Sequence, residues 1–181
     1  MGSKGLIAAP LSIKDVAAYH NDAQSSLREF FRGNSPDFVA RYVGLTPKGL
    51  EEILGERLTE TDLRSALILL TAIEAAFRLD YKTRCKQKLK DGLSREFRDV
   101  FKQSREKVKL EEQIFEAWKK HIPARKALIS ELKGAFKFRH WLAHGRPPSS
   151  KLGRKYDYPY VYDLANAVFT TLSLKIVENV R

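Results

Sequence analysis

Apolar side chains recur at intervals of three, four and seven residues along most of this chain, and this period decides the fold class. One such set is Leu63, Leu67, Leu70, Phe77 and Tyr81, and a second is Leu164, Val168, Leu172 and Ile176. Residues at these intervals share one face of an α-helix. No segment alternates convincingly between apolar and polar residues as a strand would. We therefore predict an all-α protein, an up-and-down helical bundle of four to five core helices.

Capping and breaking residues set the expected ends of the helices. Ser12 is suited to cap a helix over 13–31, and Thr46-Pro47 opens a short helix. Thr59, Thr61 or Asp62 is suited to cap a separate long core helix that continues toward Lys90. Further helices are expected over 110–121, over 124–144, where Gly145 ends the helix, and over 160–180.

The length of 181 residues, 43% of them hydrophobic, fits one globular domain with a real core. We expect a single domain over 1–181, with N-terminal helices over 10–58 and a core bundle over 59–181. The start of the chain lacks the apolar core of a signal peptide, and Cys85 is the only cysteine, so no internal disulfide can form. No apolar run is long enough to span a bilayer. These features favour a cytoplasmic protein without a membrane partner.

Positive charge dominates the sequence and is concentrated in one stretch. Lys and Arg total 33 against 22 Asp and Glu, a net charge of +11. The stretch 82–109 holds 11 basic and 4 acidic residues, so it carries 11 − 4 = +7 of that total. We expect an extra basic helical subregion here. Such an excess favours a polyanionic partner, nucleic acid before a membrane surface, although a merely solvated helical face is equally consistent with it.

A charged residue interrupts the apolar stripe of the helix before Gly145. The stripe is formed by Leu128, Leu132, Ala135 and Leu142, and Arg139 takes the place between the last two. Since an isolated buried guanidinium is costly, Arg139 must find a carboxylate, reach a cleft or bind an anion. Glu74 interrupts the stripe of the long helix in the same way, which makes it a candidate partner. A local bridge from Glu74 to Arg78 is the alternative.

Two histidines follow Arg139 at the end of the same helix. His144 lies five residues after Arg139, about 140° farther round an ideal helix, so Gly145 would have to distort the helix end to bring them together. His140 lies one turn before His144. The two could share a metal ion, but no third ligand follows at a suitable interval, and no cofactor is expected. The plain alternative for His144 is a capping or core histidine.

Arg139, His140 and His144 together resemble the motif of the HEPN superfamily, in which an Arg is followed by a polar residue and, four to six residues after the Arg, by a His. The resemblance covers 124–145 and, more loosely, the bundle over 59–180. It implies a metal-independent endoribonuclease of toxin–antitoxin or antiviral defence type, acting as a homodimer with a composite active site. By that resemblance His144 transfers protons, Arg139 holds the phosphate and His140 orients. Glu74 would support Arg139.

The same resemblance implies an RNA surface and further partners. Arg146, Lys151, Arg154 and Lys155, close to the motif, would contact flanking phosphates. The tyrosines at 156, 158, 160 and 162 could stack on bases or belong to the core. An antitoxin or a nucleotidyltransferase is a possible protein partner. The alternative function is a catalytically silent HEPN-like module that binds nucleic acid or protein.

Overall fold

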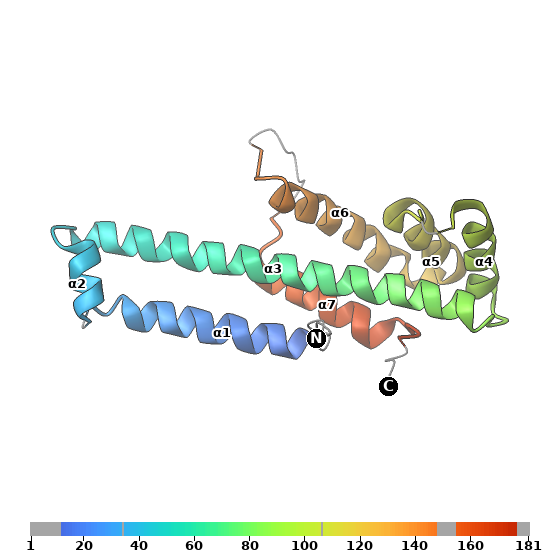
Figure 1. Cartoon of the computed structure of the whole chain (residues 1–181), viewed down its shortest axis with the longest axis horizontal. Coiled ribbons are helices and arrows are strands. Elements are labelled where there is room, and N and C mark those ends of the chain that lie inside the picture. Colours follow the sequence, from blue (N-terminus) through green and yellow to red (C-terminus); the bar gives the residue numbers. More distant parts are fainter. Residues whose placement is uncertain (1–11, 34, 106, 148–154, 177–181) are drawn as a thin grey trace, which may run out of the picture.

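The computed structural model describes residues 12–33, 35–105, 107–147 and 155–176, and every regular element in these ranges is helical. The predicted all-α bundle is confirmed. In chain order (Figure 1) the elements are α1 Ile13–Phe30, α2 Pro36–Tyr42, α3 Pro47–Lys86, α4 Gly92–Ser104, the π-helical turn η1 Leu110–Ile114, α5 Phe115–His121, the 3-10 turn η2 Pro123–Arg125, α6 Lys126–Ala143 and α7 Tyr158–Thr171.

Helix α3 runs the whole length of the molecule, and the other helices are arranged along it (Figure 1). At one end α2 connects α1 to α3, so that α1 returns antiparallel to the first half of α3. Helices α6 and α7 pack against the second half of α3, and α4 and α5 close the far end. None of the described helices combines the length and the apolar composition needed to cross a membrane.

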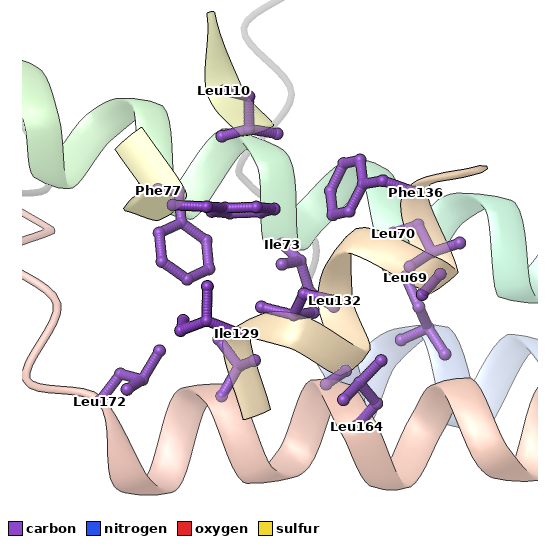
Figure 2. Packing of buried hydrophobic residues seen from close by; sticks show 14 of the residues in the cluster. Leu69, Leu70, Ile73, Phe77, Leu110, Ile129, Leu132, Phe136, Leu164 and Leu172 are labelled. Carbon is purple, nitrogen blue, oxygen red and sulfur yellow. The ribbon is translucent and has the colours of Figure 1, made fainter. Parts of the chain in front are cut away.

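The core lies where α3, α6 and α7 meet. Leu69, Leu70, Ile73 and Phe77 of α3 are completely buried, and they face Ile129 and Leu132 of α6 and Leu164 of α7 (Figure 2). The predicted stripes of α3 and α6 are therefore confirmed in part. Leu70, Phe77 and Tyr81 of α3 and Leu132 and Ala135 of α6 are buried, while Leu63, Leu67, Leu128 and Leu142 are only half-buried.

Helix α3 is continuous where we predicted two helices, and it crosses the predicted division between residues 58 and 59. The Thr61 hydroxyl donates to the Arg57 carbonyl oxygen at 2.9 Å, a bond that belongs inside a helix and not at its start. Asp62 accepts a hydrogen bond from Gln24 of α1 at 2.7 Å. Because the packing of α1 engages Asp62, this residue does not serve as a cap, and the 40-residue helix is not interrupted.

Two further helix ends differ from the prediction, and the buried ion pair of Asp80 and Arg84 lies close to both. Helix α3 ends at Lys86, and α7 ends at Thr171 instead of near residue 180. Arg84 donates to Asp80 at 2.7 Å and to the carbonyl oxygen of Ser173 at 3.0 Å, and the Lys175 amide donates to Asp80. These bonds tie the chain after α7 to α3 in a non-helical conformation. Arg84 was counted within the exposed basic stretch, but it is 5% exposed.

A buried histidine joins α1 to α3 and α7. His20 stacks on Tyr158 with ring centroids 3.6 Å apart, and its Nδ1 lies 3.1 Å from the Ser65 hydroxyl. Its Nε2 lies 3.5 Å from Asp62. Burial lowers the pKa of His20, and the Asp62 carboxylate opposes this effect only in part.

We predict that this histidine makes folding stability fall in mild acid. The unfolded chain takes up a proton on His20 near its ordinary pKa of about 6.5, whereas the folded chain resists it. The free energy of unfolding should therefore decrease as pH falls below about 6.5 and through the lower folded pKa. Urea unfolding at pH 7.5 and 5.5 measures the loss, which should shrink in His20→Asn. Ser65→Ala removes a hydrogen bond but no titrating group, so it should keep the full pH dependence; equal loss in all three chains contradicts the assignment.

Candidate functional site

The predicted interhelical ion pair is present at the centre of the molecule. Arg139 Nη2 of α6 lies 2.9 Å from Glu74 Oε2 of α3. The alternative bridge is also present, because Arg78 Nε donates to Glu74 Oε1 at 2.8 Å. One carboxylate is thus shared by two guanidinium groups. It offsets only one of their two positive charges, so this point of the surface remains cationic.

Arg139 is held without being closed off from solvent. Its side chain is 33% exposed, and its guanidinium carbon lies 5.9 Å from the centre of the Phe136 ring. Its Nε is buried and has no hydrogen-bond partner among the described residues. Arg139 lies in an open groove whose described walls carry three further cations, Arg78, Lys109 and Lys133, and three carboxylates, Glu74, Glu111 and Glu112. The arrangement suits an anion, since the guanidinium is oriented by Glu74 yet still has donors to offer.

The end of α6 has the geometry that Gly145 predicts. His144 is the C-terminal cap, and Gly145 and Arg146 both have positive φ, +80° and +58°. The Arg146 amide donates to the Trp141 carbonyl oxygen at 3.0 Å, the long bond of a Schellman motif. The Trp141 indole donates to the Pro147 carbonyl oxygen at 3.0 Å, which fixes the direction of the chain beyond the helix.

His140 and His144 are both exposed, and they lie against each other on the outer side of this helix end. Their ring centroids are 4.1 Å apart and the rings are inclined at 47°. No interaction joins either of them to Arg139, although all three residues are described. Arg139 lies on the side of α6 that faces α3. The five-residue spacing therefore places His144 on a different side of the helix. One chain therefore presents an oriented guanidinium and a histidine pair at neighbouring but separate places.

Two of the four predicted flanking cations, Arg146 and Lys155, lie in the described part of the chain. Arg146 forms a two-bonded ion pair with Glu60 of α3 at 2.7 and 2.8 Å. The hydrogen bonds in this pair lower the pKa of Glu60 and raise that of Arg146. Lys155 is 85% exposed and lies 3.4 Å from Asp157. Lys151 and Arg154 lie outside the described residues.

Of the four tyrosines near the motif, Tyr156 and Tyr158 are core residues. Tyr156 stacks on Phe138 of α6 at 5.5 Å, and its hydroxyl occupies the space that a side chain at Gly134 would need. Tyr160 and Tyr162 are half-buried against the same core. Base stacking by Tyr156 or Tyr158 would require the core to open, so we assign both to packing.

Metal-ligand residues do not cluster in the described part of the chain. No group of three or more His, Cys, Asp or Glu side chains there has the arrangement needed to hold an ion. The exposed pair of His140 and His144 lacks a third ligand of this kind.

Sequence reasoning missed the residues that extend the groove beyond Arg139. The groove continues from Arg78 to Phe101 and Arg105, near the end of α4. Phe101 gave a signal, because it is an aromatic residue in a highly charged segment, one turn after Phe97. Arg105 gave none, since its left-handed backbone, with φ of +48°, follows from how α4 ends.

Comparison with protein-family models, with curated proteins and with solved structures gives no match to this chain.

Proposed function

We propose that the protein is a metal-independent endoribonuclease that cleaves RNA through attack of a 2′-hydroxyl on the adjacent phosphate. The observation that carries this proposal is the Glu74–Arg139 pair, which orients a cation in an open groove near two exposed histidines. The resemblance of Arg139, His140 and His144 to the HEPN motif supports the same chemistry.

In the proposed reaction a base removes the 2′-hydroxyl proton as the 2′-oxygen bonds to phosphorus. The bond from phosphorus to the 5′-oxygen breaks, and an acid protonates that leaving oxygen. The products carry a 2′,3′-cyclic phosphate and a 5′-hydroxyl. Arg139 binds the phosphate and offsets the charge that develops on its oxygens. His144 transfers the proton, and His140 orients the His144 side chain.

A second copy of the chain belongs to this proposal. The base and the acid act on opposite sides of an in-line displacement, and each chain contributes a single His144. In a symmetric homodimer the two motifs face one cleft, so that His144 of one copy is the base and His144 of the other is the acid. Such a dimer also supplies an arrangement in which Arg139 and His144, separate within one chain, meet at one phosphate.

The test is an assay with labelled RNA in excess EDTA. Purified protein should cut unstructured RNA, and the 3′ fragments should begin with a hydroxyl while the 5′ fragments end in a cyclic phosphate that resists phosphatase. Absence of cleavage across structured and unstructured RNAs would reject the proposal. So would products with a 5′-phosphate, because these arise from attack by water.

A catalytically silent nucleic-acid-binding module is the second candidate, and a specific observation favours it. Arg139 is already paired with Glu74, and in one chain it makes no contact with His144. Salt-sensitive RNA binding without cleavage in the EDTA assay would support this candidate. The resemblance to the HEPN motif also supports two further proposals. One is a role as a toxin or antiviral effector, and the other is an antitoxin or nucleotidyltransferase as a partner.

We predict that the main effect of Glu74→Ala is a lower cleavage rate, with a smaller loss of thermal stability. Removing the carboxylate frees both guanidinium groups, and a displacement of Arg139 by about 1 Å can cost up to about 100-fold in rate. Cleavage kinetics and thermal unfolding measure the two effects. Glu116→Ala is the matched control, because Glu116 bridges Lys119 of its own helix and Lys133 of α6 in the same manner. If Glu74→Ala keeps full activity and an unchanged melting temperature, Glu74 has no supporting role.

A further inference from the structure

A row of three pockets, each sharing lining residues with the next, leads from Arg139 along α3 to the end of α4. Its middle section, here called the α3–α4 groove, is lined by Arg78, Tyr81, Lys82, Phe101, Arg105 and Val108. Arg78 and Val108 also line the section at Arg139, and Phe101 and Arg105 also line a third section beyond α4. The middle section has a volume of about 520 Å³, within the range of ligand clefts.

The α3–α4 groove is cationic, and most of its charge is not neutralised. Among the residues that the structure describes, Arg78, Lys82 and Arg105 line it, whereas no Asp or Glu does. Arg78 shares Glu74 with Arg139 and remains 40% exposed. Among the described residues, neither Lys82 nor Arg105 has a carboxylate partner. Three cations in a concave site attract an anion that carries more than one charge.

An aromatic ring lies exposed between these cations. Phe101 of α4 is 46% exposed and lines both the α3–α4 groove and the section beyond it. One turn earlier, Phe97 is completely buried and packs edge-on against Tyr81 at 5.1 Å. The core therefore accounts for Phe97 but not for Phe101. An exposed ring among cations is the arrangement with which proteins stack an unpaired base while they pair its phosphates.

Two local features of the groove also indicate a ligand. The Tyr81 side chain is 3% exposed, and its hydroxyl has no hydrogen-bond partner in the described part of the chain. Burial raises the pKa of Tyr81 to about 12, so the hydroxyl remains a donor. Arg105 holds a left-handed backbone that is uncommon for a residue other than glycine. An unpaired buried donor calls for an explanation, which a ligand in the groove would supply, and such backbone conformations cluster at functional sites.

We propose that the α3–α4 groove binds a single-stranded polynucleotide, with phosphates on Arg78, Lys82 and Arg105 and a base stacked on Phe101. A duplex does not fit this description, because its bases are already stacked on one another. The choice of RNA rests on the proposed function, since the groove continues to Arg139. A strand in the groove would therefore present a neighbouring phosphate to that residue.

The test measures binding separately from cleavage. Fluorescence anisotropy with a labelled 12-nucleotide oligouridine, in EDTA and on the His144→Ala chain, gives Kd as a function of salt. Phe101→Ala should weaken binding about tenfold, in line with the loss of one stacked base. Lys82→Ala should reduce the slope of log K against log salt by about 0.7, the contribution of one phosphate on a single strand. Tyr19→Ala and Lys14→Ala, which change an exposed aromatic and an exposed lysine on α1, should leave both quantities unchanged.

Several results overturn the groove assignment. Unchanged Kd in Phe101→Ala, equal losses in Phe101→Ala and Tyr19→Ala, or equal affinity for a matched duplex each reject it. Competition by polyglutamate that is as strong as that by oligouridine would point to an acidic peptide instead. Failure of the proposed function has a different signature: the wild-type chain binds oligouridine through Phe101 and Lys82 but cuts no RNA.

Discussion

Replacing Asp80 by alanine should destabilise the folded protein by about 3 kcal/mol or more, which makes it the largest stability effect we expect from one side chain. Asp80 is completely buried and receives hydrogen bonds from Arg84 and from the amide of Lys175. Without it, the buried guanidinium of Arg84 keeps hydrogen bonds to Asp91, Ser94 and Ser173 among the described residues, and a cation–π contact with Trp118. For a domain of this size the melting temperature should fall by about 6 to 12 °C.

The matched control is Asp99→Ala, because Asp99 pairs with Lys102 on the same protein but in full contact with solvent. Exposed pairs of this kind contribute little to stability because solvent screens them, so the melting temperature should hardly change. Equal losses in the two variants would show that the buried pair is not special. Calorimetry or urea unfolding measures both.

Replacing both partners should cost less than removing one. Burial raises the pKa of Asp80 despite the opposing effects of the Lys175 amide and of Arg84, so desolvation of the carboxylate outweighs its pairing. The double variant Asp80→Leu, Arg84→Met removes both desolvation costs and fills the space with apolar atoms. It should therefore be more stable than Asp80→Ala. A double variant that is less stable than the single one would contradict this account.

The parts of the fold that local periodicity controls could be predicted from the sequence. The stripes of α3 and α6 face the core as expected, and Gly145 ends α6 as a positive-φ residue should. The pairing of Glu74 with Arg139 could be predicted for the same reason. Each residue interrupts an apolar stripe, and two opposite charges that are partly buried on facing helices relieve each other's desolvation cost.

Features that depend on partners distant in sequence could not be predicted in this way. Thr61 and Asp62 have the chemistry of caps, and only the packing of α1 against α3 keeps them inside one helix. The end of α7 depends on a hydrogen bond from Arg84, 89 residues earlier. Counting charges along the sequence placed Arg84 on the surface, because such a count does not detect that Arg84 pairs with Asp80 one turn earlier. The α3–α4 groove likewise depends on where α4 lies against α3.

His144→Ala should lower the rate of RNA cleavage by about 10²- to 10⁴-fold, the usual contribution of a positioned imidazole that transfers a proton. The fold should be unaffected, because His144 is an exposed cap whose backbone amide still bonds to the His140 carbonyl oxygen at 3.0 Å. His140→Ala, the matched control on the same helix end, should have a smaller effect, since His140 orients and does not transfer the proton. Cleavage that survives His144→Ala would exclude the assigned proton carrier.

The same variant tests whether the active site is shared by two copies of the chain. If both His144 side chains act on one phosphate, only dimers of two wild-type chains are active, and activity falls with the square of the wild-type fraction. An equal mixture, refolded together so that chains exchange at random, should then retain about one quarter of the wild-type activity. A chain that acts alone retains about one half, because each wild-type copy works independently of its neighbour. A linear dependence on the wild-type fraction would therefore reject the composite site while leaving His144 as the proton carrier, and a quadratic one would require a histidine from each copy.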